Sequence, residues 1–259
     1  MKRTMSRIAA LGLSLCAAIS TGTAADAPLV LVAGGTGRTG EEVVKQLLAE
    51  NYRVRVLVRD EARAREQFGD AVEYVTGDVR EAETLEGVAR GATYVISALG
   101  SNVRKDPTNL PERVDYGGVR NLVEQASGAG VSQFVLVSSM GVTQPDHMLN
   151  RMFNNILQWK LKGEDHLRAS GVPYTIVRPG GLTTEPGGRQ GIKAEQGDRP
   201  GDGQSAPGMI ARADVATVVV RALGNRDAVG KTLEIVSDPA TTRVEWDSFF
   251  KDLVTDPAK

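Results

Sequence analysis

Three glycines follow an apolar run at three-residue spacing in the segment "LVLVAGGTGRTGEEVVKQLL". The first, Gly34, lets the chain leave a strand in a tight turn, Gly37 lets the backbone approach a pyrophosphate, and Gly40 allows close packing of helix on strand. The helix that follows offers free N–H groups and a partial positive charge to phosphate oxygens. The spacing therefore predicts a dinucleotide-binding turn, formed by Gly34, Thr36, Gly37, Arg38, Thr39 and Gly40.

A basic residue, Arg59, ends the next apolar run in "VRVLVRDEARAR". Sites for NAD usually have Asp or Glu here, which binds the ribose 2′-hydroxyl. A guanidinium matches a 2′-phosphate instead and can stack on adenine. Arg38 and Arg63 could add a second cation. The alternative is a surface pair between Arg59 and Asp60 or Glu61. We interpret the pattern as a site for NADP(H).

An acidic residue follows the third apolar run, in "VTGDV". Asp78, with Val79 beside it, is suitably placed to accept a hydrogen bond from the adenine amino group. The same carboxylate could cap the helix that follows. Both interpretations can hold together.

These residues belong to a chain in which short apolar runs alternate with helical patterns. The predicted strands are Leu29–Val32, Arg53–Val58, Glu73–Thr76, Tyr94–Ser97, Phe134–Val137, Tyr174–Val177 and Thr232–Val236. The predicted helices are Glu41–Glu50, Ala62–Gln67, Thr84–Ala89, Val114–Ala129, Asn155–Ala169 and Ala213–Leu223. This order predicts one α/β domain over residues 28–259, a doubly wound parallel sheet (Rossmann fold) that binds ligands beyond the carboxyl ends of its strands. The Gly- and Pro-rich segment Thr183–Gly208 is predicted to be a long loop.

Composition excludes several other classes. The formal net charge of −1 argues against a nucleic-acid-binding surface. The two histidines, His147 and His166, are far apart in the sequence, without ligand spacing around them, so no metal site is expected. The only cysteine, Cys16, lies in the N-terminal apolar run.

The N-terminal segment, residues 1–25, has the layout of a secretory signal, with cations, then an apolar run and small residues before a cleavage point after Ala25. We expect an exported, periplasmic protein, with an organellar transit segment as the alternative. The apolar run is too short for a permanent membrane span. Export of a folded, loaded protein usually needs a twin-arginine signal, which Lys2-Arg3 matches poorly.

Motifs along the whole mature chain point to one family. "AGGTGRTG", "TGDV", "VISALGS", "VLVSSMG", "ASGVPYTIVRPGGL" and "RADVA" follow in the order and spacing of the atypical short-chain dehydrogenase/reductases, and the chain resembles their NmrA-like, NAD(P)H-binding subgroup. The resemblance implies that Ser139 is the catalytic serine and that Lys160 is the active-site lysine, which binds the nicotinamide ribose. It also implies cofactor contacts from Ala98, Leu99 and Gly100 and from Pro179 and Gly180.

The family's catalytic tyrosine is absent from its place four residues before Lys160, where this chain has Ile156. An aliphatic side chain cannot transfer a proton. Of the five tyrosines, Tyr116 is the one that could approach the cofactor edge. Lys160 itself falls on the apolar side of its helix, since it lies four residues after Ile156. Ribose hydroxyls would explain a cation there; the alternative is a solvated surface lysine.

Two functions remain open after this reasoning. The first is an NADP(H)-dependent reductase of a small acceptor such as a quinone, a flavin or a carbonyl, which takes hydride and then a proton from water. Ser139 and Lys160 favour it. The second is a catalytically silent NADP(H)-binding redox sensor or accessory protein, which Ile156 favours. Sugar-nucleotide epimerisation also needs the missing tyrosine and ranks lower.

Overall fold

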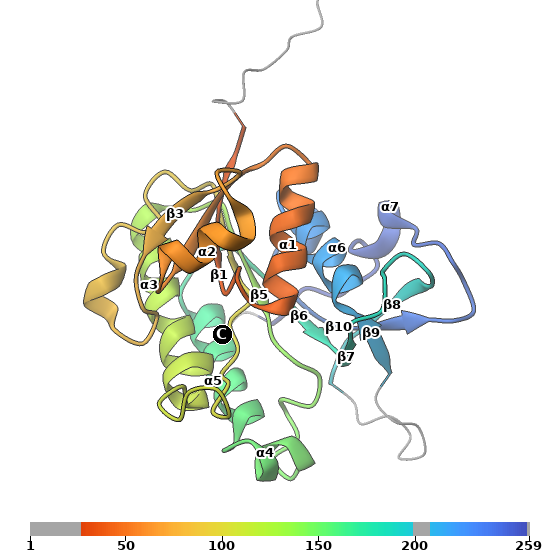
Figure 1. The fold of residues 1–259 in the computed structure, drawn as a ribbon. Coiled ribbons are helices and arrows are strands. Elements are labelled where there is room, and N and C mark those ends of the chain that lie inside the picture. The colour runs from red at the N-terminus through yellow and green to blue at the C-terminus, as the bar shows by residue number, and fades with distance from the viewer. Residues whose placement is uncertain (1–26, 199–207, 258–259) are drawn as a thin grey trace, which may run out of the picture.

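The computed structural model describes residues 27–198 and 208–257. An eight-stranded sheet has the order β3-β2-β1-β4-β5-β6-β10-β8 (Figure 1). Strands β1 to β6 and β10 are parallel and β8 is antiparallel. Their bounds are β1 Leu29–Ala33, β2 Arg53–Val58, β3 Glu73–Thr76, β4 Tyr94–Ser97, β5 Gln133–Val137, β6 Tyr174–Pro179, β8 Gly191–Glu195 and β10 Lys231–Asp238. The predicted doubly wound fold in one domain is confirmed, and the strand order changes direction between β1 and β4, where such sheets bind ligands.

Both faces of the sheet are covered because side chains of a strand alternate in direction. In β1, Val30 and Val32 belong to one apolar core, while Leu29, Leu31 and Ala33 belong to the other. The first core packs against α1, α2 and α6, and the second against α3 and α5. The helix bounds are α1 Arg38–Ala49, α2 Glu61–Phe68, α3 Val119–Ala129, α4 Met148–Met152, α5 Ile156–Ala169, α6 Arg212–Ala222 and α7 Trp246–Phe249.

The prediction of a loop over Thr183–Gly208 is wrong for much of the segment that the structure describes. It contains β8, and short strands β7 (Gly181–Thr183) and β9 (Met209–Ala211) flank it as a two-stranded sheet. Ile192 and Ala194 of β8 pack on the core at alternate positions, which supplies the apolar face that the glycines and charges around them obscured.

Two predicted helices also differ. Thr84–Ala89 forms only the short 3₁₀ helix η2 (Ala82–Leu85), and the helix predicted from Val114 begins as a π-helix, η3 (Glu112–Gly118), before α3. Gly117 and Gly118 favour the α-helix poorly, and a Cβ on Gly118 would press on Val79. Single π turns are frequent at functional sites.

Among the described residues, no helix combines the length and the apolar character needed to cross a membrane. The predicted signal segment, residues 1–25, lies outside the described residues.

Candidate functional site: a dinucleotide cleft

The glycine turn between β1 and α1 forms a backbone cradle, a concave surface that side chains at its glycine positions would fill. Gly34 has φ +79°, and a Cβ on it would lie 2.6 Å from the Ala98 carbonyl oxygen. A Cβ on Gly40 would overlap the Gly34 carbonyl oxygen. The Gly37 N–H donates to the Gly34 oxygen at 3.0 Å, and no side chain caps α1 at Gly37. The turn thus leaves the helix N-terminus open to an anion, the geometry that a pyrophosphate requires.

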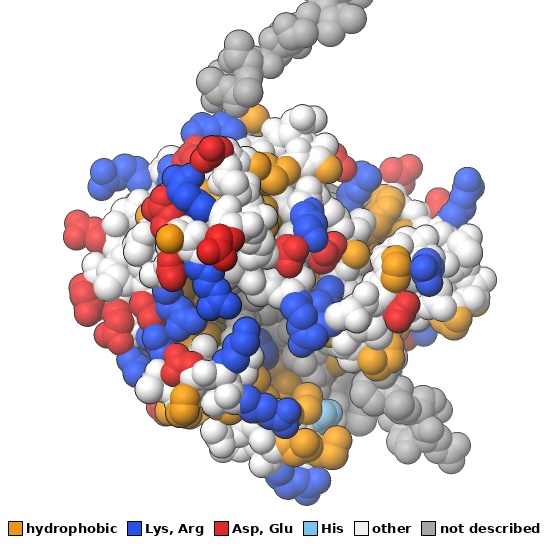
Figure 2. Space-filling view, viewed as in Figure 1, with side chains coloured by type: hydrophobic (Ala, Val, Ile, Leu, Met, Phe, Trp, Pro, Cys, Tyr) orange, Lys and Arg blue, Asp and Glu red, His pale blue; other side chains and the backbone are white. Residues whose placement is uncertain are grey.

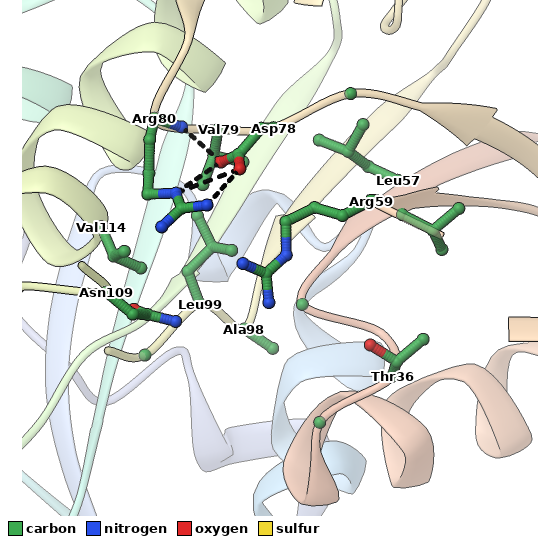
Figure 3. A pocket seen from close by; sticks show the side chains of 15 residues that line it. Thr36, Leu57, Arg59, Asp78, Val79, Arg80, Ala98, Leu99, Asn109 and Val114 are labelled. Atoms are coloured by element: carbon green, nitrogen blue, oxygen red, sulfur yellow. Dashed lines mark hydrogen bonds and ion pairs between the residues drawn. The ribbon is translucent and has the colours of Figure 1, made fainter. Parts of the chain in front are cut away.

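A cleft runs from this turn along the carboxyl ends of β1, β2, β3 and β4 (Figure 3). Nine of the predicted cofactor-binding residues line it: Gly34, Thr36, Gly37, Arg59, Asp78, Val79, Ala98, Leu99 and Gly100. The remaining predicted residues do not line this cleft: Arg38, Thr39, Gly40, Ser139, Lys160, Pro179 and Gly180. Lys and Arg side chains gather around the hollow on this face of the molecule (Figure 2).

Arg59 extends into the cleft (Figure 3) and is 54% exposed. Its partner is Asp106, at 3.7 Å, rather than the predicted surface alternatives Asp60 and Glu61. Asp60 caps α2 and Glu61 pairs with Arg65 instead. On its other side Arg59 lines a second, polar depression, together with Thr36, Val58, Asp60, Arg63, Ala64, Glu66, Gln67 and Lys105.

Cations outnumber their partners in this second depression. In the described parts of the chain, neither the Arg63 guanidinium nor the Lys105 ammonium is in an ion pair. Arg59 keeps most of its hydrogen-bonding capacity, since it has a single, long contact to Asp106. Three cations and two acids, Asp60 and Glu66, line this depression, and the excess of positive charge favours a group of high charge density, such as a phosphate.

The Asp78 carboxylate forms an ion pair with Arg80, a neighbour that the sequence reasoning did not consider. The Arg80 guanidinium donates to both carboxylate oxygens at 2.6 to 3.0 Å, and the Arg80 N–H donates as well (Figure 3). These hydrogen bonds hold the pKa of the Asp78 carboxyl below its usual range. The prediction that Asp78 caps the following helix is wrong, because η2 begins after Glu81 without a side-chain cap. The adenine contact stays a prediction.

Arg38 lies near another arginine rather than in either depression. Burial, and then the charge of Arg38, lower the pKa of Arg212 at the start of α6. Arg212 donates to the carbonyl oxygens of Thr183 at 2.9 Å and Leu182 at 3.4 Å. Arg38 and Arg212 are the first residues of α1 and α6, two helices that pack against one another.

Lys160 contacts the backbone of Leu99, a residue that lines the cleft, and pairs with an acid that sequence reasoning missed. The Lys160 ammonium lies 2.8 Å from Asp115 Oδ1 and 3.5 Å from the carbonyl oxygen of Leu99, which lines the cleft. The lysine side chain is 14% exposed, so the surface alternative for Lys160 is wrong. Asp115 could have been found because it shares an apolar helix face with Val119 and Leu122, at i, i+4 and i+7.

Ser139 faces its own loop, since its hydroxyl donates to the Met140 carbonyl oxygen at 3.0 Å. The preceding hydroxyl, of Ser138, is buried and without a hydrogen bond among the described residues, and so is that of Ser97. Ser97 is paired in register with Leu136, two residues before Ser138, so both hydroxyls face the α3–α5 side of the sheet. Buried hydroxyls without partners indicate a ligand or water in their vicinity.

Strand β6 ends at Pro179, beside the loop that follows β5, and Gly180 comes directly after it. The Met140 N–H donates to the Pro179 carbonyl oxygen at 3.0 Å. A Cβ on Gly180 would overlap the carbonyl oxygen of Gly208, so close chain packing explains this glycine. Their contact with the carboxamide stays a prediction.

Ile156, which stands at the position of the family's tyrosine, lines an apolar cavity. Ile156 and Phe153 line it, together with Ser101, Asn102, Val103, Arg104 and Pro111. Ser101, which lines this cavity, directly follows Gly100, which lines the dinucleotide cleft. Two exposed methionines, Met148 and Met152 of α4, lie on the segment that precedes Phe153.

Tyr116 is turned toward another aromatic residue. Its ring stacks on Trp159 at 6.1 Å between centroids, with Arg120 on Tyr116 and Lys162 on Trp159. Tyr116 lines none of the described pockets, and Trp159 is a half-buried stacking partner. The approach of Tyr116 to the cofactor edge is not supported by this geometry.

In the described parts of the chain no group of three or more His, Cys, Asp or Glu side chains could hold a metal ion.

Comparison with known proteins identifies the family. The NAD(P)H-binding family profile matches residues 34–226. The chain belongs to this NAD(P)H-binding family. It is 35% identical to sanguinarine reductase of Eschscholzia californica, over 81% of this chain and 89% of that protein. It is 37% identical to the chloroplastic protein TIC 62 of Pisum sativum, over 61% of this chain and 33% of that protein.

Among solved structures, the anaerobillin reductase ChuY of Escherichia coli O157:H7 is similar, with a TM-score of 0.64, 25% identity, and coverage of 81% of this chain and 97% of that one. The resemblance to atypical short-chain dehydrogenase/reductases is thus confirmed, and so is NAD(P)H binding. The NmrA-like subgroup stays a prediction.

Proposed function

We propose that this protein is an NADP(H)-dependent reductase of a small acceptor such as a quinone, a flavin or a conjugated carbonyl. The observation that carries the proposal is the mostly apolar cavity lined by Ile156, whose residue Ser101 directly follows Gly100 of the dinucleotide cleft. The residues that line this cavity offer an acceptor no phenol. Acceptors that take hydride first and then a proton from water do not need one.

The residues around the cleft fit the cofactor. The glycine cradle would hold the pyrophosphate, and Lys160 would bind the nicotinamide ribose. When bound, the cofactor supplies the hydride. The chain's own part is to orient it and to place an apolar wall, with Ile156 and Phe153, next to the reacting end.

The preference for NADP(H) is supported by the second depression. Arg59, Arg63 and Lys105 converge there without a full set of counter-ions. A 2′-phosphate brings negative charge to these cations, whereas a ribose hydroxyl would leave Arg63 and Lys105 without an ion pair. No acidic residue ends β2, where Arg59 follows Val58.

Two relatives support reductase chemistry by their names, sanguinarine reductase and anaerobillin reductase. The sensor or accessory role has its own support, because Ile156 removes the usual acid. The apolar cavity beside the cleft favours the reductase, since a silent module needs no such cavity.

The test is NADPH oxidation by the purified protein with a panel of quinones, flavins and aldehydes. We expect turnover with at least one acceptor, and a loss of about tenfold or more in kcat/KM for Lys160→Met. The matched control is Lys162→Met, which removes an exposed lysine two residues away. Tight NADPH binding without turnover across the panel would establish the sensor instead.

We also propose that residues 1–25 are a targeting segment. The segment's layout supports export, and the chloroplastic relative TIC 62 supports the organellar alternative. Fractionation of cells that express the tagged full-length protein distinguishes the two. Retention of an uncleaved chain in the cytoplasm contradicts both.

A further inference from the structure

Lys160 and Asp115 form an ion pair deep inside the protein. The Asp115 side chain is completely buried, and the two charged groups are 2.8 Å apart. The pair joins α5 to the π-helix η3, and a Cβ at Gly163 would lie 2.7 Å from the Asp115 carbonyl oxygen. The chain therefore uses a glycine and a π turn to bring these two helices close together.

Another buried ion cluster shows what a structural pair looks like in this molecule. Arg178 donates to both carboxylate oxygens of Glu164 and to Glu234, at 2.5 to 2.9 Å. Asp115 differs, because its Oδ1 contacts Lys160 without hydrogen-bond geometry and accepts no hydrogen bond among the described residues. Burying a charge pair that makes fewer hydrogen bonds than Arg178 and Glu164 do costs stability, so the arrangement favours a role beyond folding.

The second oxygen of Asp115 binds the wall of the cleft. The Ser101 N–H donates to Oδ2 at 3.1 Å. Ser101 directly follows Leu99 and Gly100, which line the dinucleotide cleft. Asp115 thus fixes both the ammonium of Lys160 and the backbone segment that Lys160 reaches.

We propose that Asp115 is a positioning residue of the dinucleotide site, which holds the Lys160 ammonium at the Leu99 carbonyl so that it faces the nicotinamide ribose. The inference rests on the proposed function. An ammonium has three donors. The Leu99 carbonyl oxygen accepts from one of them, and Asp115 Oδ1 is an ion-pair partner at 2.8 Å, so donor capacity remains for a ribose hydroxyl. Without Asp115, the flexible side chain of Lys160 would lose its ion-pair partner, and its ammonium would no longer be held in one position.

The test compares two ligands by their dissociation constants. NADPH spans the whole cleft, whereas 2′,5′-ADP has only the adenine half. For Asp115→Asn we expect NADPH to bind about tenfold more weakly, and 2′,5′-ADP to bind within about twofold of the wild type. The matched control is Glu112→Gln, which removes an exposed acid from the same π-helix and should change neither value.

A double-mutant cycle separates positioning from a general effect on the fold. In a Lys160→Met background, Asp115→Asn should weaken NADPH binding by less than about twofold, because the group that it positions is gone. Additive losses would overturn the proposal, and so would an equal loss of NADPH and 2′,5′-ADP binding, which marks a structural acid. If Asp115→Asn does not fold, Asp115→Glu is measured in the same way.

The outcomes also distinguish this inference from the proposed function. If the wild-type protein binds neither NADPH nor 2′,5′-ADP, the proposed function fails and this inference fails with it. If the wild-type protein binds both and Asp115→Asn changes neither, only the role of Asp115 fails.

Discussion

The two ends of the cleft are built in different ways. At the glycine turn the contacts available to a ligand come mainly from backbone groups, held by glycines such as Gly34 and Gly40 whose replacement would cause overlaps. Near Leu99 the contact comes from a side chain, the Lys160 ammonium, whose partner Asp115 is itself buried on a separate helix. The first end suits any dinucleotide of the family. The second has lost the tyrosine and has a buried ion pair and an apolar wall instead.

This difference indicates which part of the site is free to change. A backbone cradle is tied to the strand–turn–helix geometry, so it cannot vary without disturbing the sheet. Side chains at the reacting end can be exchanged while the fold stays the same, which is how one scaffold serves several reactions. Four substitutions test the contrast, in order of decreasing effect.

Gly40→Ala should have the largest effect, because the new Cβ would overlap the Gly34 carbonyl oxygen and the turn must open. We expect NADPH affinity to fall by about 100-fold or more, measured by fluorescence titration. Gly128→Ala in α3 is the control, since a Cβ at that position would have no neighbouring atom within 4 Å. Unchanged NADPH binding in Gly40→Ala would refute the cradle.

Arg59→Glu should reverse the charge that faces the 2′-phosphate. We expect a loss of roughly 10- to 100-fold in NADPH affinity, with NADH affinity within about twofold of the wild type. Arg90→Glu makes the same change before the amino end of β4, away from the cleft, and should leave both affinities unchanged. Equal affinities for NADPH and NADH in the wild type would contradict the assigned cofactor.

Ile156→Tyr restores a phenol four residues before Lys160. If the reacting end lacks only this acid, turnover of an aldehyde should rise by about tenfold, while quinone reduction changes by less than about twofold. Ile156→Phe has the same ring without the hydroxyl and is the control for the space that the ring occupies. An equal gain in both variants would show that packing in the cavity, rather than proton transfer, limits the reaction.

Asp78→Asn should have the smallest effect. Hydrogen bonds from Arg80 lower the pKa of the Asp78 carboxyl, so this ion pair stabilises the fold above the usual aspartate pKa of about 3.9. The contribution is lost as the pH falls through the lower folded value. Urea unfolding at pH 7 should show a deficit of about 1 kcal/mol or less in the variant, which disappears at strongly acidic pH. Asp252→Asn, an exposed acid without an ion pair among the described residues, is the control.

Much of the fold follows from local patterns. The predicted strands agree with the observed ones to within two residues at either end, as for Tyr174–Val177 and β6, because buried parallel strands are continuous apolar runs bounded by turns. Strand β8 was missed, since its sequence "GIKAE" has only two apolar side chains that pack on the core. The N-cap of α5 was also unpredictable: Asn155 makes no side-chain cap, and the buried Asn150 accepts from the Leu157 N–H instead.

The sequence by itself determined the glycine turn, the order of strands and helices, and the lack of a phenol before Lys160, because these depend on residue type and on spacing along a short stretch. Only the tertiary structure decided that Asp115 pairs with Lys160, that Arg80 binds Asp78, and that Ser139 turns to its own loop. Such contacts join side chains whose positions depend on how whole helices and loops pack. The spacing of residues along the chain does not determine the distances between these side chains.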